Sequence, residues 1–317
     1  MLRRVQGFIA DNTMGFKLTT AFILVILIPM TLLAYISYKV TDSLLMDRAR
    51  EKLGIGIKAA WSEYYVRADQ MRYGMLQAVS SDDIKRAVSR RDREHLEKVM
   101  SAWSQKRQYV DVWTVVDGSG RVIARLGSDY RGDAFEPAAI VKAAMRDREP
   151  KVSTIVFTPD LLKKEAGRLI ERYEVTKEGT WVNVGSQIDS NTGGLAITVV
   201  TPVLDDAQRP IGAIITADVL NREDHIAEAV SSKIPGLFTT ISLGGKRIST
   251  NLASWDGRPF VSTELPGQIR ASLSRGKAFV GEWKIQDATF VSMFEPIRDF
   301  DGAIIGSIDV GMNKEVL

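Results

Sequence analysis

A repeated segment in the second half of the chain constrains the fold more than any other feature of the sequence. Pro202–Ile214 and Pro296–Ile308 align without a gap at an offset of 94 residues. Each copy has a strand-like stretch with a proline, an Asp-bearing turn, and a second strand of the form I-G-x-I. A repeat at this spacing is too long for a solenoid unit and indicates a duplicated domain. Chance similarity between two hairpins is the alternative, and the matching order of elements around both copies disfavours it.

Strand-rich sequence surrounds each copy of the repeat, which defines a first and a second module. In the first module we expect strands at 109–116, 121–126, 154–157, around Trp181–Val184, 194–204 and 211–219. In the second module we expect strands at 238–243, 246–250, 278–285, 289–297 and 303–311. Each module should be a small antiparallel sheet with one or two helices on a face, so the predicted fold class is α+β.

A long helix should precede the first module. The stretch Val40–Val79 has no proline, and its apolar residues from Leu45 to Val79 are spaced by three and four. At ~1.5 Å per residue, this helix would reach about 60 Å. Gly54 and Gly56 should form a soft point in it. The apolar stripe needs a partner, which is the following domain, a second copy of the chain, or both.

Shorter helices are indicated by their capping residues and apolar spacing. Ser81 and Asp82 are expected to cap one helix, and Asp92 is expected to cap the next. Further helices are expected from Glu136-Pro137 to Met145, at 222–231 and at 268–275.

An uncharged segment of 21 residues, Leu18–Tyr38, lies near the start of the chain. As a helix it would span roughly 31 Å, about the hydrocarbon thickness of a bilayer. Lys17 and Lys39 flank it on either side. A cleaved signal peptide is the alternative, but its apolar part would be about 7–15 residues long and followed by a small-residue cleavage site. The sequence therefore predicts one uncleaved transmembrane helix.

The charges around this span predict its orientation. Arg3, Arg4 and Lys17 precede it with only Asp11 against them, so the N-terminus should be cytoplasmic. Basic residues between 48 and 52 oppose this assignment, although acids are interspersed with them. Everything after the span should then lie outside the inner membrane of a bacterial cell, in the periplasm.

Composition excludes several classes of function. Cysteine is absent, which rules out disulfides, cysteine-ligated zinc, iron–sulfur clusters and thiol catalysis. His95 and His225 are the two histidines, so a His-rich metal site is not available. The net charge of +3 without a clustered basic face gives no support for nucleic-acid binding. No phosphate-binding loop or nucleophile elbow is present, so we expect no enzyme activity, metal or cofactor in this chain.

A small-molecule site is the sharper hypothesis, and the first module supplies its candidates. Tyr109, Trp113, Arg125, Tyr130 and Arg131 lie in or just after the first expected hairpin. Arginine suits a carboxylate, and aromatic side chains suit a small organic body. The alternative is that Trp113 belongs to the core and that the arginines are solvated.

The second module offers weaker candidates of the same kind. Thr239, Asn251 and Arg258 are polar residues close to its expected strands, whereas Met293 and Phe294 are expected to pack.

Two stretches of the second module carry a family resemblance. RISTNLASWDGRPFVSTEL and AFVGEWKIQDATFVSMFEPIRDFDGAIIGSIDVGM resemble the Cache superfamily of extracytoplasmic sensors. In the first module, VDVWTVVDGSGRVIARLG and GGLAITVVTPVLDDAQRPIGAI are similar to a Cache module as well. Together with the anchor and the long helix, the chain resembles a double Cache sensor with tandem PAS-like modules over Val40–Leu317. The amino-acid-binding signature of some double Cache domains is not evident.

The resemblance implies an order of parts along the chain. The expected parts are a cytoplasmic segment (1–17), a transmembrane helix (18–38), a helical stalk (40–108), a membrane-distal Cache module (109–221), a linker helix (222–236) and a membrane-proximal Cache module (237–317).

The resemblance also implies a role in small-molecule sensing for a histidine kinase, a chemotaxis receptor or a cyclic-di-nucleotide enzyme. The expected partners are the membrane, a second copy of the chain in a homodimer, and a small ligand for which a carboxylate is a candidate. The rival hypothesis is a membrane-anchored periplasmic module that binds another protein and transmits nothing. No second apolar span precedes Leu317, so we expect either a fragment, with a kinase or cyclase output domain after Leu317, or a protein that lacks an output domain.

Overall fold

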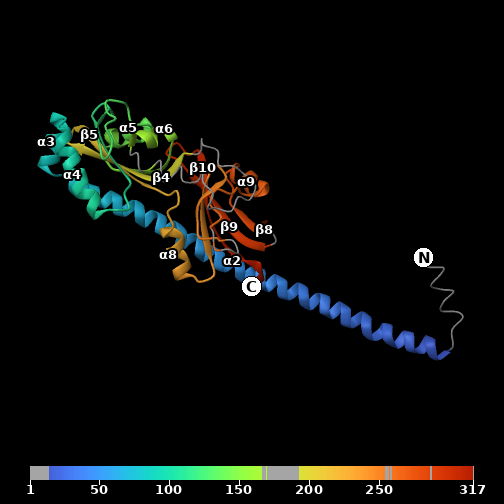
Figure 1. Ribbon diagram of the computed structural model, residues 1–317. Coiled ribbons are helices and arrows are strands. Elements are labelled where there is room, and N and C mark those ends of the chain that lie inside the picture. The colour runs from blue at the N-terminus through green and yellow to red at the C-terminus, as the bar shows by residue number, and fades with distance from the viewer. Residues whose placement is uncertain are drawn as a thin grey trace. The chain divides into compact units, whose positions relative to one another are not determined.

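The computed structural model describes residues 14–165, 169, 193–253, 257, 259–285 and 288–316. It contains two compact units, which divide along the chain between Lys52 and Leu53. The second unit holds two antiparallel five-stranded sheets with their helices. Figure 1 labels β4 and β5 of the first sheet and β8, β9 and β10 of the second. The predicted fold class, a long N-terminal helix followed by two α+β modules, is therefore confirmed.

One helix, α2 (Met14–Val79), contains both the apolar run and the predicted stalk. Pro29 lies inside this helix without ending it. The N-terminal part of the helix is long and apolar enough to cross a membrane, with a mean hydropathy of 2.3 over a window in which no residue is buried. Length and composition thus agree with the predicted membrane span.

The stalk part of α2 is covered by the modules of its own chain. Within the second unit its buried residues recur every three or four positions: Leu53, Ile57, Ala60, Tyr64, Ala68, Met71, Met75 and Val79. Of the partners that the sequence left open for this stripe, the following modules are therefore one.

Helix α2 continues through both stalk glycines, and the soft point expected there stays a prediction. A Cβ atom at Gly56 would lie 2.5 Å from Cδ1 of Leu237 and 3.4 Å from Cγ2 of Val310, whereas one at Gly54 would meet nothing within 4 Å. Gly56 is thus a point of close approach between helix and sheet.

The first module is built on a sheet with the strand order β2-β1-β5-β4-β3. Its strands are β1 (Val112–Asp117), β2 (Val122–Arg125), β3 (Lys151–Phe157), β4 (Gly194–Leu204) and β5 (Pro210–Val219). Its helices are α3 (Asp82–Arg90), α4 (Arg93–Lys106), α5 (Ala138–Asp147) and α6 (Pro159–Glu165). The strand predicted around Trp181–Val184 lies outside the described residues.

The second module has the equivalent strand order, β7-β6-β10-β9-β8. Its strands are β6 (Phe238–Leu243), β7 (Lys246–Thr250), β8 (Phe279–Ile285), β9 (Ala288–Arg298) and β10 (Ile304–Asn313). Helix α8 (His225–Lys233) precedes the sheet, α9 (Gly267–Leu273) lies between β7 and β8, and a short 3-10 helix, η2 (Lys314–Val316), follows β10.

The repeat seen in the sequence is a repeat of structure. Strands β4 and β5 correspond end for end to β9 and β10 at the same offset of 94 residues. The turns are closed in the same way: the Asp205 carboxylate accepts a hydrogen bond from the Arg209 amide, and Asp299 accepts one from the Ala303 amide, each at 2.8 Å. The two modules are thus copies of one fold.

The glycine of each I-G-x-I strand is required by backbone packing. A Cβ atom at Gly212 would lie 2.3 Å from the carbonyl oxygen of Val116, and one at Gly306 would lie 2.2 Å from that of Ser242. Both oxygens belong to the neighbouring strand, so no side chain fits at either position.

The proline of each repeat lies where its strand has lost one neighbour. Strand β3 pairs with β4 only as far as Val200, and β8 pairs with β9 only as far as Phe294. Pro202 and Pro296 each follow two residues later, where a missing amide N–H is tolerated.

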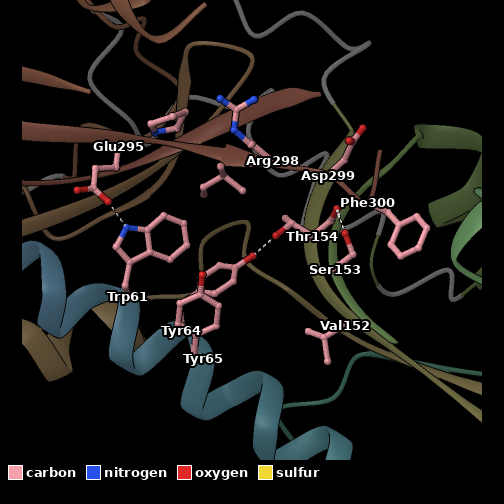
Figure 2. A pocket seen from close by; sticks show the side chains of 12 residues that line it. Trp61, Tyr64, Tyr65, Val152, Ser153, Thr154, Glu295, Arg298, Asp299 and Phe300 are labelled. Carbon is pink, nitrogen blue, oxygen red and sulfur yellow. Dashed lines mark hydrogen bonds between the residues drawn. The ribbon is translucent and has the colours of Figure 1, made fainter. Parts of the chain in front are cut away.

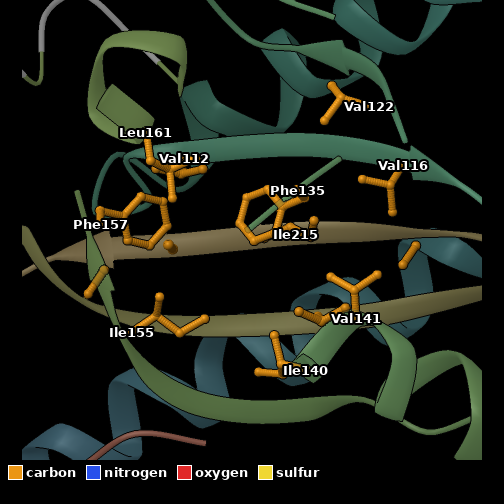
Figure 3. Close-up of a cluster of buried hydrophobic side chains, with 14 of the residues drawn as sticks. Val112, Val116, Val122, Phe135, Ile140, Val141, Ile155, Phe157, Leu161 and Ile215 are labelled. Atoms are coloured by element: carbon orange, nitrogen blue, oxygen red, sulfur yellow. The ribbon is translucent and has the colours of Figure 1, made fainter. Parts of the chain in front are cut away.

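Each module has its own apolar core on one face of its sheet. Figure 3 shows the first core, with Phe135 and Phe157 packed edge to face at 6.3 Å and with Ile140 and Val141 contributed by α5. The second core is aromatic, and in it Trp283 stacks on Phe290 at 5.2 Å.

Helix ends follow the predictions in part. The Asp92 side chain accepts a hydrogen bond from the His95 amide and caps α4 as expected. Ser81 precedes α3 but makes no capping bond with its side chain. Helix α8 begins at His225, three residues after the predicted start, because Arg222 adopts a positive φ of 59°.

Candidate functional site

Arg125, a predicted ligand-binding residue, lies at the end of β2 with its guanidinium inside the first module. Its Nε donates to Glu165 at 2.7 Å, and its two Nη atoms donate to the Asp133 carboxylate at 2.8 and 3.0 Å. Nη1 also donates to the carbonyl of Tyr130 at 2.8 Å, and Glu165 accepts a further bond from the Thr114 hydroxyl. An incoming carboxylate would have to displace one of these acids.

The two acids of this network have two basic neighbours, because Lys164 also lies 3.5 Å from Asp133. The hydrogen bond from Arg125 holds the pKa of Asp133 below its usual value, while burial raises the pKa of Glu165. The contacts therefore make Arg125 the centre of an internal ion-pair network.

Two of the predicted aromatic residues lie away from this network. Trp113 is fully buried, donates from Nε1 to the Val110 carbonyl at 3.1 Å, and lies 6.2 Å from the ring of Trp103. Tyr109 is half-buried beneath the guanidinium of Arg67, which is 4.3 Å from its ring centre. Both contacts are also expected of packing residues.

The structure does not bring the five predicted side chains together on one face. Arg125 on β2 pairs with Thr114 on β1, so these two side chains lie on the same face of the sheet. Trp113 precedes Thr114 in β1, so its side chain points to the opposite face. The side chains of Tyr130 and Arg131 are exposed, and Tyr130 contributes its backbone carbonyl to Arg125. The ligand-binding roles of all five residues stay predictions.

The weaker candidates of the second module differ in their contacts, and the buried Thr239 hydroxyl has no hydrogen-bond partner among the described residues. Asn251 accepts a hydrogen bond from the Thr239 amide at 2.7 Å and donates to the Ala227 carbonyl at 3.3 Å, which ties β6 to α8. Phe294 packs in the aromatic core as predicted. Arg258 lies outside the described residues.

Among the buried polar residues on the core-bearing face of the second sheet, we group four as the inner polar cluster: Ser242, Arg247, Ser307 and Asp309. Ser242 pairs directly with both Arg247 and Ser307, while Asp309 pairs with the core residue Phe294. All four are at most 1% exposed. The register therefore buries a cation, an acid and two hydroxyls beside an aromatic core.

One nitrogen of Arg247 is held firmly and another is not. Nη1 donates to the Thr263 hydroxyl at 2.8 Å and to the Glu264 carbonyl at 2.9 Å, and the guanidinium lies 4.9 Å from the ring centre of Trp283. Within the described part of the chain, Nη2 has no hydrogen-bond partner. The guanidinium is thus oriented with one donor to spare.

The other members of the cluster also lack partners among the described residues. Neither carboxylate oxygen of Asp309 accepts a hydrogen bond, and the hydroxyls of Ser242 and Ser307 make none. Burial raises the pKa of Asp309 well above its usual value, and the nearby Arg247 cation opposes this shift. Buried polar groups are almost always bonded, so four unsatisfied side chains on one face require an explanation.

A pocket of about 400 Å³ reaches this cluster. It is lined by Gly244, Gly245, Arg270, Leu273, Ser274, Ile304, Ile305, Gly306 and Ser307. Ser307 thus belongs to both the pocket and the cluster, and Asp309 follows on the same face about 7 Å further along β10.

A second pocket, of about 620 Å³, lies between α2 and both modules (Figure 2). Helix α2 contributes Trp61, Tyr64 and Tyr65, and the modules contribute 152–154 and 295–300. Nε1 of Trp61 donates to Glu295 at 2.6 Å, and the hydroxyl of Tyr64 is hydrogen-bonded to that of Thr154. The stalk therefore contacts the first module through β3 and the second through β9.

The β9–β10 turn adds a contact between the modules. Phe300, in this turn, packs against the apolar core of the first module. The equivalent residue of the first module, Asp206, is exposed and forms an ion pair with Lys85 at 2.9 Å. The two turns have the same fold but different contacts.

Sequence reasoning missed Arg247 and Asp309, although a signal was present for Asp309. Asp309 is the one charged residue in the largely apolar, β-branched stretch IIGSIDV, whereas KRIST has Ile248 as its one apolar residue and gave no such signal for Arg247. A charge among residues that are otherwise buried on both faces of a strand indicates an internal polar site.

Comparison with known proteins gives one family match. Residues 218–317 match the family model described as single Cache domain 3. This range includes helix α8, the whole second sheet and the inner polar cluster. No curated protein sequence matches the chain.

Several solved structures resemble the chain at low sequence identity. The periplasmic domain of Vibrio cholerae LuxQ has a TM-score of 0.44 and 11% identity, over 82% of this chain and 98% of that one. The ligand-binding domain of the Pseudomonas aeruginosa amino acid chemoreceptor PctB, with L-arginine, has a TM-score of 0.41 and 14% identity, over 86% and 96%. That of the Campylobacter jejuni chemoreceptor Tlp3, with L-valine, has a TM-score of 0.42 and 9% identity, over 88% and 96%.

Proposed function

Because the C-terminal module of this chain is a Cache domain, we propose that the chain is the extracytoplasmic sensing region of a bacterial transmembrane receptor. Its stimulus is a small molecule, and its output is of the histidine-kinase or methyl-accepting chemotaxis type. The chain itself catalyses no reaction. Residues after the apolar run lie outside the cytoplasm, so a phosphatase reporter fused after Leu317 should be active there.

The packing of the Cache module on the stalk is the observation that carries this proposal. Leu237 and Val310 close on Gly56, and Glu295 accepts a hydrogen bond from Trp61. Gly56 and Trp61 belong to α2, the same helix that contains the apolar run. A change in the shape of this module would therefore act directly on the helix that leads to the membrane.

Signalling of this kind needs two packings of the stalk on the sheet. A ligand shifts the balance only by as much as it prefers one packing over the other. The contacts at Gly56 and Trp61 are close and specific, so a shift of the sheet cannot be absorbed there without moving the helix.

A ligand screen on the full chain in lipid nanodiscs tests the proposal. Thermal unfolding is followed against a library of metabolites that includes carboxylates, amines, amino acids and sugars. A ligand that binds only the folded state stabilises it by ~2.7 kcal/mol at a hundredfold excess over Kd. For a protein of this size we expect a shift of a few degrees.

The same ligand should change the output of a chimera in which the chain is fused to a histidine-kinase output domain. Gly56→Leu should keep ligand binding but weaken this response, because the side chain would separate the stalk from Leu237. A library without any stabilising compound, together with capture of a specific protein partner, would support the rival interaction module instead.

A further inference from the structure

We propose that the inner polar cluster of the Cache module is the ligand site, and that its ligand is a small zwitterion. The carboxylate of the ligand binds Arg247, and its ammonium group binds Asp309. This inference rests on the proposed function and goes beyond it by naming the site and the chemistry of the ligand.

The duplicated fold provides a control for what the cluster does. Through the strand pairings and the offset of the repeat, Ser242, Arg247, Ser307 and Asp309 occupy the positions of Val116, Val122, Ala213 and Ile215 in the first module. Those four residues all belong to the apolar core of the first module. The fold therefore fills these positions with apolar side chains when nothing else is required, so folding does not account for the polar set.

The contacts of the cluster show which of its polar atoms have no hydrogen-bond partner among the described residues. Arg247 is held by Thr263 and Glu264 through Nη1, with its Nη2 atom left over. No ion pair links Arg247 to Asp309 among the described contacts, although each side chain affects the pKa of the other. A third group that accepts a hydrogen bond from Arg247 and donates one to Asp309 would satisfy both side chains.

The first module shows the same chemistry completed by the chain itself. There a buried arginine, Arg125, has its donors occupied by the carboxylates of Glu165 and Asp133. Asp309, the acid near Arg247, has no hydrogen-bond partner among the residues that the structure describes. A ligand carboxylate would accept a hydrogen bond from Arg247 and balance its charge, as Glu165 does for Arg125.

Charge balance selects the class of ligand. A carboxylate without an amine would leave the acceptors of Asp309 empty, and an amine without a carboxylate would leave Nη2 of Arg247 empty. A zwitterion pairs both charges and leaves the buried site neutral, which avoids the cost of an unpaired buried charge. The hydroxyls of Ser242 and Ser307 can donate to or accept from either end of it.

Access to the site follows from the adjacent pocket. Ser307 is the cluster residue that lines the pocket of about 400 Å³, and Arg270 also lines it. Arg270 is paired with Glu264 at 3.4 Å, so its cation is already partly balanced. A small ligand can pass through this pocket into the cluster, whereas part of a larger ligand would have to remain in the pocket.

The first test replaces the cluster with its apolar counterparts from the first module. In the full chain, the variant Ser242→Val, Arg247→Val, Ser307→Ala and Asp309→Ile should unfold cooperatively with a Tm at least as high as that of the parent protein. It should also lose the thermal shift given by any ligand found in the library screen. A lower Tm without ligand would mean that the cluster holds the fold together, which would overturn the inference.

The second test separates the two charges by calorimetry with matched probes: γ-aminobutyrate, butyrate and butylamine, and L-alanine, propionate and ethylamine, alongside every hit of the screen. Zwitterions should bind at least ten times more tightly than their single-charge analogues. Asp309→Asn should remove this advantage, and a control change at the exposed Lys277 should not.

The outcomes distinguish this inference from the proposed function. Ligand binding that survives the fourfold replacement, or hits that carry one charge or none, would overturn the inference and leave the sensing role intact. Absence of binding by every probe and every library compound would overturn both.

Discussion

At the scale of single residues, burial decides what an arginine can do. Arg125 and Arg247 are both 1% exposed, but the first has the carboxylates of two neighbours and the second has a hydroxyl and a carbonyl. Removing the partner of a buried charge lowers the free energy of unfolding. A buried charge without a charged partner in the protein can instead bind the opposite charge of a ligand.

Arg125→Met should destabilise the protein strongly, because Glu165 would be left buried without its counter-charge. We expect a loss of ~3–5 kcal/mol in the free energy of unfolding, measured by urea denaturation. The double variant Arg125→Met and Glu165→Gln should recover part of this loss. Arg131→Met, at an exposed position, is the matched control and should leave stability unchanged.

The acid limb of the stability profile should depend on Asp133. Its pKa is lowered in the folded state by the hydrogen bond from Arg125, so its contribution is fully present above the unfolded value of ~3.9. The contribution is lost as pH falls through the lower folded pKa. Asp133→Asn should therefore reduce stability at pH 6 and flatten its fall below pH 4, as followed by thermal unfolding. An unaltered slope would contradict this assignment.

Single residues were predictable where their effect is local. The capping role of Asp92 needs only the next three residues, and the structure confirms it. The partners of Arg125 could not be read from the sequence, because Glu165 is 40 residues away and reaches it only through the fold. Arg247 and Asp309 were missed because charges in an alternating strand usually mark a solvated face, and here that face is covered.

At the scale of secondary-structure elements, the stalk shows how one glycine allows a helix to pack closely against its neighbours. Gly54 and Gly56 have the same intrinsic cost in a helix, but their surroundings differ. Two identical substitutions on one helix can therefore separate helix propensity from packing.

Gly54→Ala should stabilise the protein by up to about 1 kcal/mol, because Ala is the better helix former and the new methyl group meets nothing. Gly56→Ala should destabilise it, since the same methyl group would press on Leu237, at a cost of ~1–3 kcal/mol. Thermal unfolding of the pair measures both effects. Equal shifts in the same direction would show that α2 and the second sheet are not closely packed at this point.

Elements with a strong pattern were predicted well, and elements that depend on neighbours were not. The hairpins of the repeat matched to within a residue or two because turn chemistry and alternation agree there. Strand β3 begins at Lys151, three residues before its predicted start, because its first residues alternate between partly exposed and exposed positions. The helix over Val40–Val79 was predicted, but the close packing of Gly56 on Leu237 was not, because it depends on a residue far away in the sequence.

At the scale of the whole molecule, the stalk has a second apolar row, on the side of α2 away from the buried one. Val66, Tyr73 and Leu76 are 46%, 62% and 41% exposed, with spacings of seven and three that place them on one side of α2. The homodimer proposed from the sequence would bury this row, because the stripe first considered for it is covered by the modules.

Cysteines placed on the two sides of α2 test this arrangement, and the natural chain has no cysteine to interfere. In membranes, Tyr73→Cys and Leu76→Cys should crosslink between copies of the chain. Met71→Cys and Met75→Cys, on the buried side, should not. Equal crosslinking on both sides, or none at either, would contradict a dimer formed through the exposed row.

The contact made by Phe300 shows what duplication has done to this molecule. Two copies of a gene segment are identical at first, but at this position the two modules now differ. The first module has the exposed, charged Asp206, and the second has Phe300, whose ring packs against the core of the first module. A recombinant with two copies of the second module would carry a bare phenylalanine where Asp206 now lies. A recombinant with two copies of the first would place an aspartate against an apolar core. The order of the two modules has therefore become a heritable property of the chain, fixed by one turn.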